Sequence, residues 1–283
     1  MNIQHFFDPA TYTLTYVVWD DSSKDAIIID PVLDYDQASS AISHDSADQV
    51  IQFVQNKGLS LHAILETHAH ADHVSGARYI QETFPEAKVL IGENITKVQS
   101  TFAKVYNFKD ALTDGSQFDG LLKDGSTVSF GSISVGVTNT PGHTPACSSF
   151  KIGDVVFTGD ALFMPDFGVG RCDFPGGDAN ALYQSVHEKL YKLPDDTRVF
   201  TGHDYQPGGR DLAFESTIGQ QKAENVHLKA STSEADFVDF RTKRDAKLKA
   251  PRLLLPSIQL NVFGGRLPAP EDNGVRYLKV PLS

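Results

Sequence analysis

The chain has 283 residues, of which 40% are hydrophobic and 22% are charged, which suits one large globular domain. No apolar run approaches the ~20 residues of a membrane span, and a formal net charge of −11 disfavours nucleic acid as a partner. Residues 1–8 lack a basic stretch followed by an apolar core, and the two cysteines, Cys147 and Cys172, suit reduced thiols, so we expect a cytoplasmic protein.

The first part of the chain alternates strands with helices. A β-rich segment at 11–19, turn residues at 20–25 and an apolar segment at 26–29 are typical of a hairpin. Apolar residues recur at helical spacing between 46 and 57, and Gly58 follows as a helix stop. In chain order we further expect a loop at 34–45, strands at 63–65 and 88–91, and helices at 76–83 and 95–106.

The remaining chain is richer in strands, loops and charged helices. Aspartates between 107 and 125 lack the spacing of a calcium-binding EF-hand loop, which favours solvated turns around weak strands. We expect strands at 127–139, 148–151, 155–157 and 199–201, a Gly/Pro-rich loop at 163–178, and helices at 181–193, 214–227 and 234–249. Five prolines between 251 and 283 predict an extended tail over the surface. We therefore predict a catalytic domain at 1–250 and a C-terminal extension at 251–283 that packs on it.

Metal-binding side chains crowd the end of the strand at 63–65. His68, His70, Asp72 and His73 follow this strand within one turn. Imidazole and carboxylate are suitable ligands for zinc and iron, and residues two apart in an extended turn point the same way. The spacing does not match a helical HExxH zinc site. The cluster therefore predicts a metal site at the end of a strand.

Three later residues of the same chemical kinds also follow strands. His143 comes after the strand at 127–139, Asp160 after the strand at 155–157, and His203 after the strand at 199–201. One shared metal edge requires such an arrangement. The complete set could hold two metals with Asp160 between them.

The segment from His68 to His73 has the HxHxDH signature of the metallo-β-lactamase superfamily, which the chain therefore resembles. The resemblance implies an α+β fold, the αββα sandwich, in which two mixed sheets pack face to face with helices outside. It also implies that the metal lies at one edge and that His143, Asp160 and His203 are further ligands. Asp30, at the end of the strand at 26–29, is either a turn residue before Pro31 or a group behind the ligands.

Two reactions are compatible with these ligands. Two zinc ions would activate a bridging water for hydrolysis, as in a glyoxalase II-like hydroxyacylglutathione thioesterase. One Fe(II) ion held by two histidines and one carboxylate would leave three positions open for a thiolate and dioxygen. The motifs TPGHTPAC at 140–147, GRCDF at 170–174 and GHDY at 202–205 resemble those of the persulfide (sulfur) dioxygenases, in a bacterial branch of that family.

This second resemblance implies that glutathione persulfide, dioxygen and water are converted to sulfite and glutathione. One Fe(II) per chain would be held by His68, His143 and Asp160. The residues His70, Asp72, His73 and His203 would orient that triad or, with two zinc ions, bind the second metal. The residues do not fix the oligomeric state, and the superfamily suggests a homodimer.

Four further residues are predicted to bind the substrate. The guanidinium of Arg171 suits a glutathione carboxylate, and an ion pair with Asp173 or Asp178 is the alternative. Tyr205 would line the same mouth or serve in packing. Asn261 and Arg266 are placed over glutathione as a further prediction. Both cysteines are expected to be structural thiols.

Overall fold

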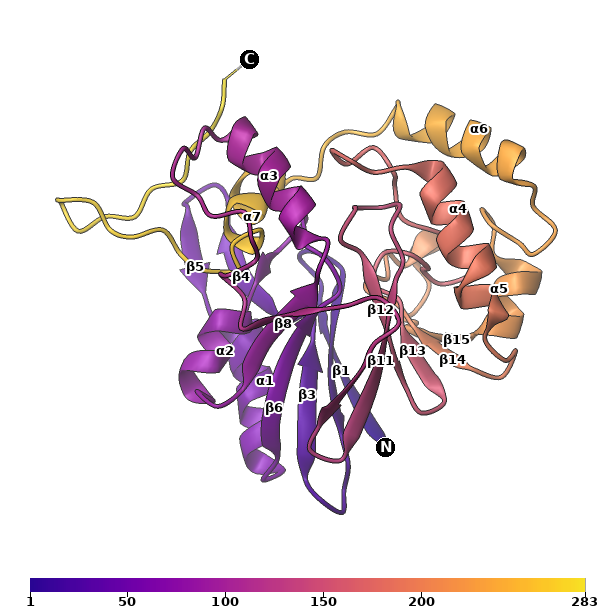
Figure 1. The fold of residues 1–283 in the computed structure, drawn as a ribbon, viewed down its shortest axis with the longest axis horizontal. Helices are drawn as coiled ribbons and strands as arrows, with labels where there is room; N and C mark the ends of the chain where they lie inside the picture. The colour runs from indigo at the N-terminus through magenta and orange to yellow at the C-terminus, as the bar shows by residue number, and fades with distance from the viewer. Residues whose placement is uncertain (283) are drawn as a thin grey trace.

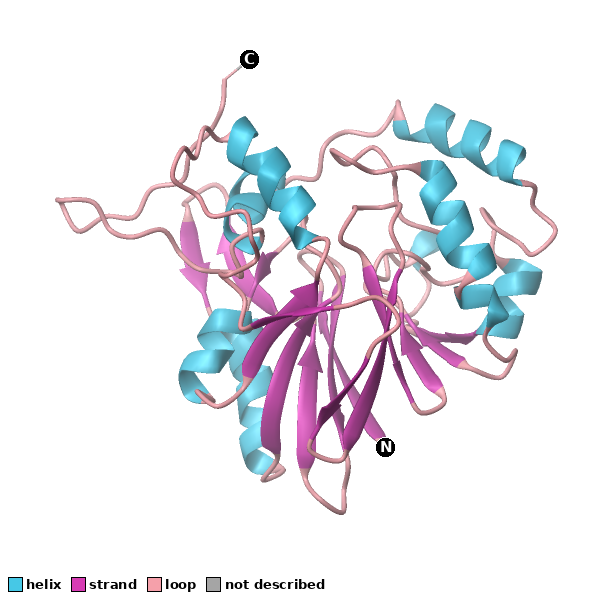
Figure 2. Cartoon of the chain, viewed as in Figure 1, coloured by secondary structure: helices cyan, strands magenta, loops and turns pink. Residues whose placement is uncertain are grey.

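The computed structural model describes residues 1–282 and shows two sheets packed face to face with helices on their outer sides (Figure 1, Figure 2). The first sheet has the order β1 (Asn2–Asp8), β2 (Thr13–Trp19), β3 (Asp25–Ile29), β6 (Ser60–Glu66), β8 (Lys88–Gly92) and β9 (Gly120–Leu122). The second has the order β10 (Thr127–Phe130), β11 (Ile133–Asn139), β12 (Ser148–Ile152), β13 (Val155–Phe157), β14 (Arg198–Phe200) and β15 (Glu215–Thr217). Both sheets combine parallel and antiparallel pairs, so the expected mixed αββα sandwich is confirmed.

Alternation along the strands separates three apolar layers. In β3, Ile27 and Ile29 point between the sheets, whereas Ile28 points to the outer side, because successive side chains of a strand face opposite ways. The outer side of the first sheet is covered by α1 (Asp45–Asn56), α2 (Ala77–Thr83) and α3 (Ile95–Val105). The outer side of the second sheet is covered by α4 (Ala179–Glu188), α5 (Ile218–Glu224) and α6 (Glu234–Asp245).

Phe150 fills the layer between the sheets and has no exposed surface. We expect Phe150→Ala to lower the free energy of unfolding by about 3–5 kcal/mol, because the change removes buried apolar atoms and leaves a cavity. Urea unfolding followed by circular dichroism measures this difference. Phe240→Ala, at a side chain that is 38% exposed on α6, serves as the control and should change stability by well under 1 kcal/mol.

Four expectations from the sequence are wrong. The segment at 127–139, expected as one strand, forms the antiparallel pair β10 and β11. The predicted loop at 34–45 instead contains β4 (Val32–Asp36) and β5 (Ala41–Ser43), which pair with each other and, through β4, with β7 (Val74–Ser75). The predicted helix at 214–227 begins later, since Thr217 and Gln220 form a capping box that starts α5 at Ile218. The predicted tail contains α7 (Leu254–Asn261), which tolerates Pro256 because the proline lies in its first turn.

The C-terminal segment is attached to the core through α7. Ile258 and Val262 belong to the same apolar cluster as α1, α2 and α3, and α7 packs on β7. The boundary at residue 250 stays a prediction. No helix within residues 1–282 combines the length and apolar character needed to cross a membrane.

Candidate metal centre

The strands deliver the ligand-type residues to one edge of the sandwich. β13 and β14 are parallel, and β11 is antiparallel to β12, which is antiparallel to β13, so β11, β13 and β14 end on the same side. His143, Asp160 and His203 follow the ends of these three strands. The segment from His68 to His73 follows β6 of the facing sheet. The seven residues form two neighbouring groups: His68, His143 and Asp160; and His70, Asp72, His73 and His203.

The first group presents two imidazoles with defined tautomers. The hydroxyl of Thr67 donates to Asp30 Oδ2 at 2.7 Å, so it must accept from His68 Nδ1, which lies 3.0 Å away. Nδ1 of His143 donates to the carbonyl oxygen of Arg171 at 2.7 Å. Both Nε2 atoms therefore carry a lone pair toward the site. Burial and the neighbouring His70 and His143 hold the pKa of His68 well below its usual value, which favours the neutral ligand form.

The second group meets the first at Asp160. Oδ1 of Asp160 lies 3.3 Å from His203 Nε2, while Oδ2 lies 3.5 Å from His143 Nε2. Asp72 Oδ2 lies 3.3 Å from both His203 Nε2 and His73 Nδ1. Burial raises the pKa of Asp72, but the imidazoles of His203 and His73 outweigh it and hold that pKa well below its usual value. The two Asp160 oxygens thus face one group each, as the expected sharing of Asp160 requires.

Two buried carboxylates lie behind His70. Nε2 of His70 is 3.0 Å from Asp30 Oδ1 and 3.2 Å from Glu66 Oε2. Burial alone lowers the pKa of His70, but these carboxylates outweigh it and raise the pKa well above its usual value. Nε2 faces these two carboxylates, so Nδ1 is the ring atom left for a metal. Asp30 has both of the roles expected for it. It is a turn residue with a left-handed φ of 50° before Pro31, and its carboxylate lies behind His70 and orients that ring.

Unpaired polar atoms indicate that a cation belongs here. The buried atoms His68 Nε2, His70 Nδ1, His73 Nε2, His203 Nε2 and Asp160 Oδ1 have no hydrogen-bond partner within residues 1–282. Leaving such atoms unpaired is costly, and metal-binding histidines usually bond through their second ring nitrogen to a neighbouring group. Here that group is a hydroxyl for His68 and His203 and a carboxylate for His70. Imidazole and carboxylate suit zinc or iron equally, so the donor set does not choose between them.

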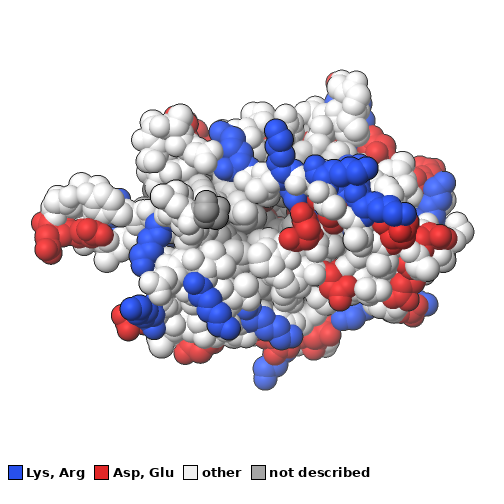
Figure 3. Space-filling view, turned by 90° about the horizontal axis from the view of Figure 1, so that it is seen from above, with Lys and Arg blue, Asp and Glu red and all other residues white. Residues whose placement is uncertain are grey.

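Arg171 forms the ion pair that was the alternative to substrate binding. Its guanidinium donates two bonds of 2.6 Å to Asp173 and one of 2.7 Å to the carbonyl of Lys249. Asp178 instead caps α4. Basic side chains gather beside the end of α6 on the face seen in Figure 3. Lys243 and Arg244 in the last turn of α6 and Lys247 just after it are exposed and line one surface hollow together with Asp239.

Tyr205 lies beside both groups, with its ring 5.6 Å from that of His203 and stacked on Phe167 at 4.6 Å. Burial and the nearby Asp160 and Asp72 raise the pKa of Tyr205 well above its usual value, so the hydroxyl is neutral. The ring therefore has the packing role that was one of the two expectations, and substrate binding by Tyr205 stays a prediction.

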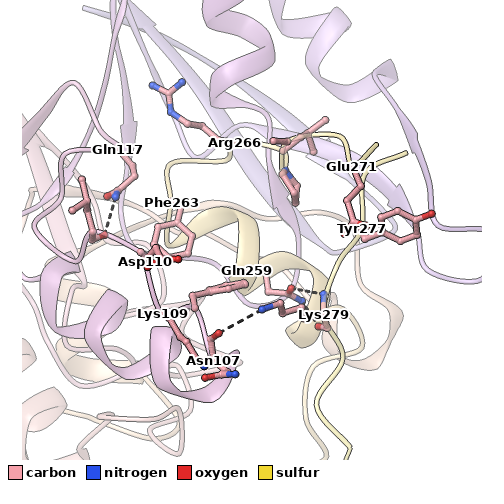
Figure 4. A pocket seen from close by; sticks show the side chains of 16 residues that line it. Asn107, Lys109, Asp110, Gln117, Gln259, Phe263, Arg266, Glu271, Tyr277 and Lys279 are labelled. Carbon is pink, nitrogen blue, oxygen red and sulfur yellow. Dashed lines mark hydrogen bonds between the residues drawn. The ribbon is translucent and has the colours of Figure 1, made fainter. Parts of the chain in front are cut away.

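The two tail residues lie in different surroundings. The side-chain amide of Asn261 is buried and fully bonded to the backbone of residues 70, 73 and 75, which leaves it no donor for a substrate. Arg266 lines a separate cavity of about 820 Å³, whose wall also includes Phe263, Gln259 and Tyr277 but no residue of the two groups (Figure 4). The side chain of Arg266 therefore lies away from the two ligand groups.

Several residues that hold the ligands were not foreseen. Thr13 lies 3.2 Å from His73 Nδ1 and 3.5 Å from His203 Nδ1, but a threonine in a strand gives no signal in the sequence. Glu66 could have been recognised in the sequence as a group behind the ligands, because it is a carboxylate at the end of an apolar strand. Both thiols are buried, and burial raises the pKa of Cys147 to about 12, which suits the expected structural role.

Comparison with known proteins gives one family and two kinds of named relative. The metallo-beta-lactamase superfamily model matches residues 8–203. A probable metallo-hydrolase of Burkholderia pseudomallei is 48% identical over 100% of this chain and 99% of its own length. Glyoxylase B2 of Dictyostelium discoideum is 46% identical over 99% of this chain and 97% of its own length. The human mitochondrial persulfide dioxygenase ETHE1 is 32% identical over 82% of this chain and 78% of its own length.

The comparison of structures agrees with this family. The crystal structure of ETHE1 from Myxococcus xanthus superposes with a TM-score of 0.76 at 29% identity, covering 94% of this chain and 100% of that one. The chain spans 64% of the length of the beta-lactamase hydrolase-like protein of Xylella fastidiosa, to which it is 48% identical.

Proposed function

Because the chain belongs to the metallo-beta-lactamase superfamily, we propose that the two ligand groups are its active site and that the protein is a persulfide dioxygenase with one Fe(II) ion. The proposed substrates are glutathione persulfide and dioxygen, and the products are sulfite and glutathione. The cytoplasm as its location and a homodimer as its assembly stay predictions from the sequence.

The observation that carries this proposal is that His68, His143 and Asp160 form a group that does not include His70. Two histidines and one carboxylate whose ligand atoms lie within 4.8 Å of one another match the set that holds non-haem Fe(II). His70, by contrast, groups with Asp72, His73 and His203, and its Nε2 is engaged by Asp30 and Glu66. The similarity to ETHE1 over nearly the whole chain also supports this reading.

The chain's own groups have identifiable tasks in such a reaction. Bound Fe(II) would supply open positions at which the persulfide sulfur and dioxygen meet. The carbonyl of Arg171 fixes the ring of His143, and Thr67 fixes that of His68, so the triad is rigid before the substrates arrive. The neutral hydroxyl of Tyr205 can donate a hydrogen bond to an anionic sulfur.

Charge near the site suits an anionic substrate. The basic residues beside α6 are linked to the site through the bond from Arg171 to the Lys249 carbonyl and the bond from His143 to the Arg171 carbonyl. Lys243 is paired with Asp239. Positive charge left at this place would raise the association rate of an anionic substrate. A carboxylate of glutathione would have to compete with Asp173 to reach Arg171 itself.

The second candidate is a glyoxalase II-like thioesterase with two zinc ions. It is favoured by the two Asp160 oxygens, which face both groups, and by the 46% identity to Glyoxylase B2. Metal analysis of the purified protein, followed by two assays, separates the candidates. About one iron per chain and rapid oxygen uptake with glutathione persulfide are expected. Two zinc ions, cleavage of lactoylglutathione and no oxygen uptake would instead establish the hydrolase.

Asp72→Ala tests the number of metals. With a mononuclear triad, iron should remain bound, because Asp72 belongs to the other group, and turnover should fall by about 10–100-fold as for the loss of a group behind a ligand. Iron content and oxygen uptake are measured on the same sample. Loss of all metal from this variant would favour the two-metal site.

A further inference from the structure

The C-terminal helix α7 reaches the metal loop through its last residue, Asn261. This side chain is only 4% exposed. Its Oδ1 accepts from the backbone N–H of Ser75 at 2.9 Å, and its Nδ2 donates to the carbonyls of His70 at 2.8 Å and His73 at 2.7 Å. The amide cannot be turned over, because two donors would then face each other at Ser75 and oxygens would face oxygens at the histidines.

These three bonds supply what the loop cannot supply for itself. Residues 67–73 form no strand or helix between β6 and β7, so buried backbone groups there need partners from elsewhere. Asn261 pairs with the backbone of both His70 and His73, which belong to one ligand group. A single side chain therefore fixes the separation of two candidate ligands.

A second chain of bonds closes around the same histidine. The Ser75 hydroxyl donates to Glu66 Oε1, and Glu66 Oε2 lies 3.2 Å from His70 Nε2. His70 is thus held at its carbonyl by Asn261 and at its ring by Glu66 and Asp30. Ser75 joins the two, since its N–H binds Asn261 and its hydroxyl binds Glu66.

We propose that Asn261 is a positioning residue of the metal centre, which sets the geometry of His70 and His73 and thereby the affinity of the site for metal. The residue lies outside the 8–203 segment that the superfamily model matches, so the C-terminal extension completes the metal site in this chain. The inference rests only on the metal-binding part of the proposed function. It holds whichever of the two reactions the protein catalyses.

The test compares Asn261→Ala with Gln259→Ala. Gln259 is a matched control, because it lies on the same helix and is 5% exposed. Its side-chain amide forms hydrogen bonds with the backbone of Leu255 and Lys279 and none with the loop. Affinity for Fe(II) and Zn(II) alone is measured by chelator competition, and Co(II) is added to record the absorption spectrum of the site. Asn261→Ala should bind metal about 10–100-fold more weakly and change the cobalt spectrum, whereas Gln259→Ala should do neither. Equal affinities and identical spectra in the two variants would overturn the proposal.

A measurement on the unchanged protein applies even if Asn261→Ala does not fold. If the bonds of Asn261 and metal binding are coupled, each must stabilise the other. Hydrogen exchange of the Ser75 amide, whose N–H binds Asn261, should therefore slow several-fold on addition of metal. An exchange rate that metal leaves unchanged would also overturn the proposal. Neither measurement uses substrate, so a failed dioxygenase assay would not affect the result.

Discussion

Replacement of His143 by alanine is expected to remove the metal and the oxygen uptake together. The Nε2 atom of His143 is one of the three proposed ligands, and the Arg171 carbonyl holds its ring in place. Loss of a group behind a ligand costs about 10–100-fold in affinity, so loss of a ligand itself should exceed about 100-fold. Metal content after gel filtration and oxygen uptake with glutathione persulfide should fall in proportion to each other.

His62→Ala is the control for this experiment. His62 lies on β6, the strand that leads to His68, but pairs with Asp25 at 2.6 Å, and its side chain is 34% exposed. This variant should keep its metal and its rate. If His143→Ala kept a full complement of iron and full oxygen uptake, His143 would not belong to the triad.

The parts of the fold that follow from local pattern were predictable from the sequence. Residues typical of strands in 11–19 and 26–29 predicted β2 and β3. Alternation in 127–139 predicted the extended chain there but not the turn between β10 and β11, and each expected ligand follows a strand that the structure contains. The ligand positions were accessible because metal chemistry restricts the residue types and the superfamily signature restricts their spacing. The two groups and their contact at Asp160 required the structure.

The rest depends on distant partners that the local sequence does not reveal. β4 and β5 are short segments of mixed polarity, and they are strands because they pair with each other and, through β4, with β7. The helix α7 is stabilised by burial of Ile258 and Val262, which outweighs the prolines around it. The sequence predicted Asn261 over glutathione, and only its bonds to residues 70–75, almost two hundred positions earlier, reveal its place beside the metal loop.

Asp160→Asn is expected to have the broadest effect, because the two oxygens of Asp160 face both ligand groups. The substitution preserves size in a crowded place, since Gly202 and Gly170 pack against this residue. It removes one negative charge and directs an NH₂ group toward one set of imidazoles. Metal affinity and oxygen uptake should each fall by more than about 100-fold, for the same reason as at His143.

Thermal unfolding with and without a chelator gives a second measure of this loss. A metal present at 1,000 times its dissociation constant stabilises the folded state by about 4 kcal/mol. The chelator should therefore lower the melting temperature of the unchanged protein but not that of Asp160→Asn. Asp154→Asn, at the exposed turn on the opposite end of β13, should respond as the unchanged protein does. A chelator response of normal size in Asp160→Asn would mean that metal is held without Asp160, and both proposed arrangements of the site would then be wrong.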